Sequence, residues 1–150
     1  MSASEDDAPR VAAEPATLAL RLVAMVYDAI PLLPILLLVS TLALLLNGGE
    51  PVTAPAARLG LLAATWLAIG AYFVVSWRRG GATMGMRPWR LQVRDRDGRI
   101  ATTSALWARY ALATVSLGAA GLGFLWSLFD GDRRTWHDLG SGTVLLRVAG

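Results

Sequence analysis

The 150-residue chain is 55% hydrophobic with a mean hydropathy of +0.48, which excludes an ordinary soluble domain and favours a small polytopic membrane protein. All 14 basic residues are arginines, and the sequence pI is near 10.2. Because these arginines cluster beside apolar segments, they indicate a positive cytoplasmic face against anionic lipid headgroups, with no nucleic acid as partner. The lack of cysteine excludes a disulfide framework, thiol chemistry and a cysteine metal site.

The first segment, Met1–Thr17, is expected to be a disordered acidic tail. It holds four acidic residues among alanine, serine and proline, and it has no apolar periodicity. Its acidic character and the lack of a small-residue cleavage site argue against a signal peptide. Residues 18–150 are then expected to form one transmembrane domain, with apolar stretches at about 22–46, 59–77 and 104–129.

The first apolar stretch, Leu22–Leu46, is long enough to cross a membrane and contains a single charged residue, Asp28. Arg21 stands at its start. Seven residues are close to two helical turns, so both side chains project from one helix face, about 10 Å apart along the axis. Pro31 and Pro34 follow within the same stretch, and they predict a kink with carbonyl groups left unpaired one turn earlier.

The second apolar stretch, Leu59–Trp77, has no charged residue and leads into a basic loop over residues 78–103. An excess of arginine marks a cytoplasmic loop, so the N-terminus is expected in the cytoplasm as well. The arginines of this loop are Arg78, Arg79, Arg87, Arg90, Arg94, Arg96 and Arg99. Small residues also recur along one face of the second stretch, which makes a homo-oligomer an expected alternative to the monomer.

The basic loop carries the pattern of a β-strand. Apolar residues alternate with polar ones from Trp89 to Arg94, and Asp97-Gly98 supplies a turn signal for a hairpin. The segment Thr143–Val148 also has strand character, is too short to span a membrane and needs a partner, so we expect these two strands to pair. The preceding turn, Gly81–Gly85, lacks the Lys-Ser/Thr pair that ends a phosphate-binding loop.

The third apolar stretch, Ser104–Phe129, is compatible with two topologies. Trp107 and Trp126 lie about 28 Å apart along a helix, which would suit interfacial anchors at the two ends of one span. A glycine-rich interruption in the middle and arginines after the far end favour instead two short helices that form a hairpin. Under this preferred hairpin topology, both flanks and the C-terminus lie in the cytoplasm.

Four residues are candidates for an ion or proton network: Arg21, Asp28, Asp138 and His137. The hairpin topology brings the tail to the start of the first stretch, so Asp138 is expected to pair with Arg21. Histidine titrates near neutral pH, and an aspartate in a low dielectric is pushed toward it, so Asp28 and His137 are the expected proton carriers. The alternative is a structural clamp between tail and helix. Ser141 beside His137 and Asp138 has no catalytic spacing, so we expect no enzyme, metal or cofactor.

These motifs together resemble the RDD family of small bacterial multipass membrane proteins, which is named for one arginine and two aspartates. The matching positions are Arg21–Asp28, Gly81–Arg87, Leu91–Gly98, Arg109-Tyr110, Gly123–Trp126 and Asp130–Thr143. The resemblance assigns the named charges to Arg21, Asp28 and Asp138. Members usually carry lysine where this chain has Met86.

The resemblance implies an integral protein of the bacterial plasma (inner) membrane, and transport, including cation/proton exchange, has been proposed for part of the family. The expected fold is an all-α membrane protein with two transmembrane helices, a third apolar segment and a small cytoplasmic β element. Two function classes follow. The first is a transporter or cation/proton exchanger that acts as an oligomer. The second is a non-transporting assembly or interaction protein whose buried charges are structural.

Overall fold

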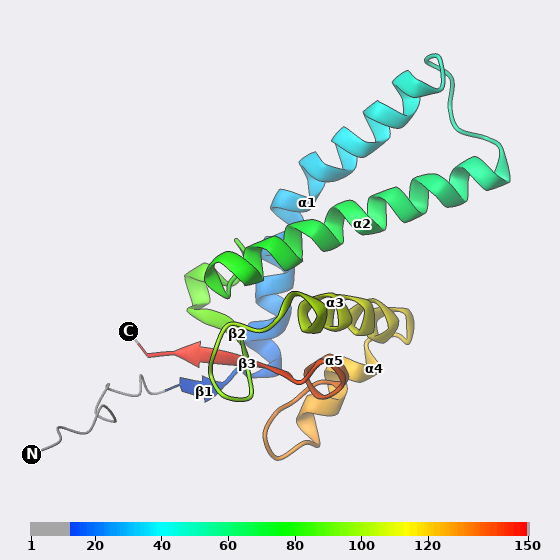
Figure 1. Ribbon diagram of the computed structural model, residues 1–150. Coiled ribbons are helices and arrows are strands. Elements are labelled where there is room, and N and C mark those ends of the chain that lie inside the picture. The colour runs from blue at the N-terminus through cyan, green and yellow to red at the C-terminus, as the bar shows by residue number, and fades with distance from the viewer. Residues whose placement is uncertain (1–12, 150) are drawn as a thin grey trace, which may run out of the picture.

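The computed structural model describes residues 13–149 and is mostly helical, with a small antiparallel sheet at one end (Figure 1). This confirms the expected fold class. The elements in chain order are β1 Ala13–Pro15, α1 Leu18–Leu46, α2 Pro55–Gly80, the 3₁₀ turn η1 Arg87–Trp89, β2 Leu91–Asp95, α3 Thr103–Gly118, α4 Leu122–Leu125, η2 Trp126–Leu128, α5 Trp136–Ser141 and β3 Thr143–Val148.

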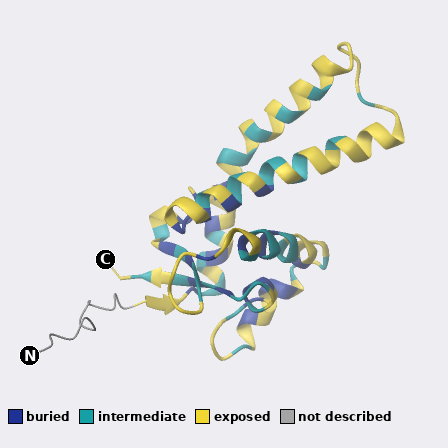
Figure 2. Ribbon diagram, viewed as in Figure 1, coloured by how far each residue is buried: buried dark blue, intermediate teal, exposed yellow. Residues whose placement is uncertain are grey.

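Helices α1 and α2 are both long and apolar enough to cross a membrane, as the sequence predicted. The Thr17 side chain caps α1 by accepting a hydrogen bond from the Leu20 backbone N–H at 3.4 Å. Gly81 ends α2 in the left-handed conformation, at φ +71°. Pro31 and Pro34 lie inside α1, and Figure 1 shows its blue and cyan parts running in different directions. The outer halves of both helices expose apolar side chains (Figure 2).

The third apolar stretch forms the two short helical segments that the glycine-rich interruption predicted. Helix α3 and the segment Leu122–Leu128 are bent by 107° at the break between them. Ala120 and Gly121 make this turn with φ angles of +54° and +78°. The chain then returns through α5 to the sheet, so α3 begins and β3 ends at the same end of the molecule (Figure 1).

An aromatic cluster joins α3 to α2. The absence of a side chain at Gly70 allows the rings of Trp107 and Tyr110 to reach the α2 backbone, since a Cβ there would lie 2.7 Å from Tyr110. The Tyr110 hydroxyl donates to the Trp66 carbonyl at 2.9 Å. Trp107 is therefore partly buried against α2.

The sheet has the strand order β1-β3-β2 and is antiparallel throughout. Its β2–β3 pairing, with Leu91 opposite Arg147, confirms the strand partnership predicted from the sequence. Strand β1 corrects the predicted tail, because Ala13–Pro15 are ordered against β3 where a disordered segment up to Thr17 was expected. Residues 1–12 lie outside the described part. An edge strand needs one hydrogen-bonded side only, which explains why this short proline-containing segment can pair without apolar periodicity.

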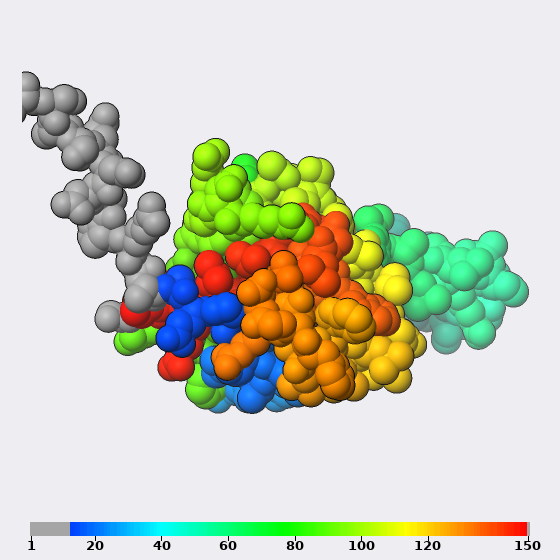
Figure 3. All heavy atoms as spheres, turned by 90° about the horizontal axis from the view of Figure 1, so that it is seen from below, coloured from blue at the N-terminus to red at the C-terminus, as the bar shows by residue number. Residues whose placement is uncertain are grey.

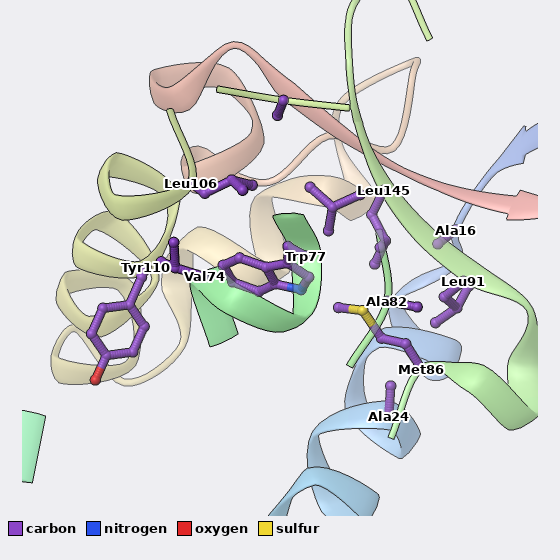
Figure 4. Packing of buried hydrophobic residues seen from close by; sticks show 12 residues of the cluster. Ala16, Ala24, Val74, Trp77, Ala82, Met86, Leu91, Leu106, Tyr110 and Leu145 are labelled. Atoms are coloured by element: carbon purple, nitrogen blue, oxygen red, sulfur yellow. The ribbon is translucent and has the colours of Figure 1, made fainter. Parts of the chain in front are cut away.

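The hydrophobic core lies where the inner halves of α1 and α2, helix α3 and the sheet meet. Figure 4 shows Trp77 of α2 at its centre, with Leu106 of α3 on one side and Met86 and Ala24 on the other. Leu91 is fully buried beneath the sheet. This core joins the sheet to α3 and to the inner halves of α1 and α2. The candidate site residues project into the same region.

Candidate functional site

The position of Asp138 is fixed by the short helix α5. Thr135 caps this helix: its hydroxyl accepts from the Asp138 backbone N–H at 3.3 Å, and Asp138 Oδ2 accepts from the Thr135 backbone N–H at 3.0 Å. This reciprocal capping box satisfies two backbone donors that would otherwise be unpaired. It also holds the carboxylate in one orientation, facing α1 and α3.

Two buried arginines from different helices meet on this carboxylate. Arg21 Nη1 of α1 lies 2.8 Å from Asp138 Oδ2, as an ion pair without hydrogen-bond alignment. Arg109 Nη1 of α3 donates to Asp138 Oδ1 at 2.5 Å. The structure thus brings Arg21 and Asp138 together as the sequence predicted. The sequence analysis missed Arg109, although it stands in a matching family position.

Both arginines also donate hydrogen bonds to other groups of the protein. Arg21 donates to the carbonyls of Ala16 at 3.3 Å and Arg133 at 3.0 Å, and Arg109 donates to the Thr143 hydroxyl at 2.7 Å. The Arg109 guanidinium also lies 5.5 Å from the centroid of the Trp77 ring. We call Arg21, Arg109, Asp138 and Thr143 the Asp138 cluster; it links α1, α3, α5 and β3.

The charge balance of the cluster keeps Asp138 ionised. Burial alone would raise the pKa of this carboxyl, but the neighbouring guanidinium groups of Arg109 and Arg21 more than offset that effect and hold the pKa below its usual range. Two arginines against one carboxylate leave one excess positive charge. Asp138 therefore acts as an anionic bridge between helices and is poorly suited to releasing and taking up protons near neutral pH.

His137 is buried against the ring of Phe124, with the ring centroids 4.7 Å apart. Its Nδ1 atom finds no hydrogen-bond partner in the part of the chain that the structure describes. Burial and the positive charge of Arg109 lower the pKa of His137 to about 3, so its imidazole is neutral at physiological pH. This differs from the expectation of a histidine that titrates near neutral pH, because that expectation left out the desolvation of the ring.

The depressed pKa of His137 predicts that acid destabilises the protein. The folded state keeps the imidazole neutral, whereas the unfolded chain protonates it near pH 6.5. The contribution of His137 to the free energy of unfolding is therefore fully present above pH 6.5 and is lost as the pH falls toward 3. We expect the free energy of unfolding to fall by about 1.4 kcal/mol per pH unit between pH 6 and 4. His137→Phe should remove this slope, measured by unfolding in detergent at several pH values. The chain has no second histidine, so no other imidazole can produce this slope. An unchanged slope in the variant would exclude His137 as its source.

Asp28 belongs to a separate cluster at the start of the basic loop. Its carboxylate accepts hydrogen bonds from the Thr83 hydroxyl at 2.6 Å, the Gly85 backbone N–H at 2.9 Å and the Tyr72 hydroxyl at 3.1 Å. We call these residues the Asp28 cluster. Among the described residues no hydrogen bond or ion pair joins Asp28 to Arg21, so the network expected from their shared helix face is divided in two.

The loop Gly81–Gly85 is shaped to hold the Asp28 carboxylate. A Cβ on Gly85 would overlap the Ala24 carbonyl oxygen and lie 2.8 Å from Asp28 Cγ, so only glycine allows the loop to approach α1 this closely. The backbone N–H of Met84 donates to the Tyr72 hydroxyl at 3.2 Å and orients that side chain. The sequence of this loop is Gly-x-Thr-x-Gly, and the sequence analysis predicted only a turn there. The loop in fact supplies hydrogen-bond donors to the Asp28 carboxylate.

Two cavities adjoin the Asp138 cluster. The first, of about 130 Å³, is mainly apolar and lies among α1, α2 and α3; we call it the inner cavity. The second, of about 260 Å³, lies beside β3 and the segment 132–134; we call it the sheet-side cavity. Arg21 and Leu145 line both, so these two side chains form part of the wall between them. Within residues 13–149 no group of three His, Asp or Glu side chains is placed to hold a metal ion.

The RDD family model matches residues 15–142, which include the Asp28 cluster and every member of the Asp138 cluster except Thr143. No curated protein and no solved structure matches the chain significantly.

Proposed function

The chain belongs to the RDD family, and from this membership we propose that it moves a small cation or a proton across the bacterial inner membrane. It is a membrane protein with two candidate transmembrane helices and a bent apolar helix pair. So few helices hardly enclose a path within one chain, and we therefore propose that the working form is an oligomer. The route would pass beside the Asp138 cluster.

The observation that supports this proposal is the pair of cavities on either side of Arg21. Buried ionisable residues in membrane segments are costly, and they commonly mark the paths of ions or substrates. Here the Arg21–Asp138 ion pair stands between a mainly apolar cavity among the helices and a cavity beside the sheet that is lined in part by charged side chains. A rearrangement of Arg21 and Leu145 would open part of the wall between the two.

The non-transporting alternative also rests on an observation. Asp28 has three donors and Asp138 has two arginines and a backbone N–H, so both carboxylates are fully engaged by the protein. Such satisfied networks serve packing in many membrane proteins. On this account the charges clamp the sheet onto the helices, and the protein acts as an assembly or interaction component.

The orientation we propose places the sheet and the basic loop in the cytoplasm, against anionic lipid headgroups. Figure 3 shows β1, β3, the segment after α4 and the basic loop gathered on one face of the molecule, away from the projecting α1–α2 hairpin. Most arginines of the loop are exposed there, where a positive surface meets the inner leaflet. A bacterial alkaline phosphatase fused to the C-terminus should be inactive, because this reporter enzyme folds to its active form only in the periplasm. An active fusion would contradict this orientation.

The experiment that tests transport is a flux assay on purified protein in liposomes loaded with a pH-sensitive dye. An imposed Na⁺ or K⁺ gradient should drive a change in internal pH. Leu145→Ala removes part of the wall between the cavities and should increase the flux per folded protein. Leu91→Ala is the matched control, since Leu91 is equally buried but lines neither cavity. A flux no greater than that of empty liposomes would exclude this transport and favour the alternative in which the buried charges are structural.

A further inference from the structure

Among residues 13–149, two polar atoms on side chains that line the inner cavity have neither a hydrogen-bond partner nor an ion-pair partner. They are the indole Nε1 of Trp77 and Nδ1 of His137, and both side chains are at least nine-tenths buried. Arg21 Nη1 also lacks a hydrogen bond, but it is paired with Asp138. Figure 4 shows the indole nitrogen pointing toward Met86, which also lines the cavity. A buried donor without a partner is destabilising, so a molecule that offers one is favoured at this position.

The charged residues of the cavity wall are already engaged by partners within the protein, with one excess positive charge on the Asp138 cluster. Arg21 and Arg109 share Asp138, and Asp28 is held by the donors of its own cluster. His137 is neutral. With the two cavities separate, a cation in this apolar space would lose its hydration and meet the excess positive charge, and an anion would have to compete with Asp138 for the same guanidinium groups. An uncharged ligand is therefore favoured.

The size and the surroundings of the cavity restrict the ligand further. A volume of about 130 Å³ is close to that of cavities that take up one aromatic ring. At its edge stand Met25 of α1 and Leu117 of α3, whose side chains are 37% and 53% exposed. Both belong to apolar segments of the candidate membrane region, so a molecule dissolved in the bilayer can reach the cavity without crossing a polar surface.

We propose that the inner cavity binds an uncharged, ring-sized head group with a hydroxyl or carbonyl oxygen, presented by a molecule from the lipid phase. The oxygen accepts a hydrogen bond from Trp77 Nε1, and a hydroxyl can also donate to His137 Nδ1. Any apolar tail extends between Met25 and Leu117 into the bilayer. This site does not depend on transport, since a non-transporting protein would bind the same molecule.

The test uses two photoreactive probes on the full chain in lipid bilayers. One is a phenyl diazirine with a hydroxymethyl group, and the other carries a methyl group in its place. Mass spectrometry locates the attachment sites. We expect the alcohol to label α1 near Met25 and α3 near Leu117 about five-fold more than the methyl analogue, the factor that one hydrogen bond supplies. Trp77→Phe keeps an aromatic ring but removes the N–H donor, and it should lower this preference to what a hydroxyl bond to His137 Nδ1 alone supplies.

A second pair of variants tests the location. Ala113→Leu places extra volume in the inner cavity and should suppress labelling there, whereas Ala64→Leu alters the separate gap between the outer ends of α1 and α2 and should not. If Ala113→Leu lowers the amount of folded protein, the Trp77→Phe comparison still decides. Equal labelling by both probes, or labelling only along the lipid-exposed outer helices, would overturn the proposal.

Discussion

Asp138→Asn should be among the most destabilising single substitutions in the chain, lowering the free energy of unfolding by about 3–5 kcal/mol. Asparagine has the same shape, and its side-chain oxygen can still accept from the Thr135 N–H, so the cap of α5 survives. What is lost is the one negative charge shared by Arg21 and Arg109, which would leave two buried cations side by side. Unfolding by denaturing detergent in mixed micelles measures the loss.

The matched control is Asp132→Asn. The Asp132 side chain is 69% exposed and contacts Arg134 at the surface, so its substitution should change stability by less than about 0.5 kcal/mol. Arg21→Met should cost less than Asp138→Asn, because Arg109 still pairs with the carboxylate. A loss for Asp138→Asn no larger than that of Asp132→Asn would contradict the role of Asp138 as the shared anion.

Gly85→Ala should lower the free energy of unfolding by about 3 kcal/mol or more, although it adds a single methyl group. The new Cβ would overlap the Ala24 carbonyl oxygen of α1, so the loop must move away from the helix. Overpacking of this kind costs about 1–3 kcal/mol. The movement also breaks the hydrogen bonds from the loop to the Asp28 carboxylate, each worth about 1.5–3 kcal/mol for a charged acceptor.

Gly80→Ala provides the control for this substitution. Gly80 is the last residue of α2, and a Cβ there meets nothing within 4 Å. Alanine favours helix more than glycine does, so this variant should be neutral or gain up to about 1 kcal/mol. Equal losses for the two variants, in the same micelle unfolding assay, would indicate a general intolerance of this turn and not a close approach at Gly85.

The sequence predicted the parts of this fold that depend on local pattern or on unpaired edges. Long apolar runs give α1 and α2 directly, and the glycine-rich interruption gives the bend after α3. The pairing of β3 with β2 followed because each strand was too short to be stable alone. Strand β1 escaped notice, since a three-residue edge strand has no periodicity of its own.

The candidate site was predictable only in part, because its contacts join residues distant in sequence. Arg21 and Asp138 were assigned to each other from topology, and the ion pair confirms that contact. The spacing of Arg21 and Asp28 fixes their shared helix face, but it cannot specify which partner each one meets. Asp28 meets a loop 55 residues later, at Thr83. Arg109 appeared as one arginine in an apolar helix, the kind of intramembrane charge that signals a buried partner.

A pair of double-mutant cycles tests the division into two clusters most directly. One cycle combines Arg21→Met with Asp138→Asn, and the other combines Arg21→Met with Asp28→Asn, with unfolding in mixed micelles as the readout. We expect a coupling energy of at least about 1 kcal/mol between Arg21 and Asp138, which are in contact, and additivity within about 0.5 kcal/mol between Arg21 and Asp28. Additive losses in the first cycle, or strong coupling in the second, would contradict this arrangement of the buried charges.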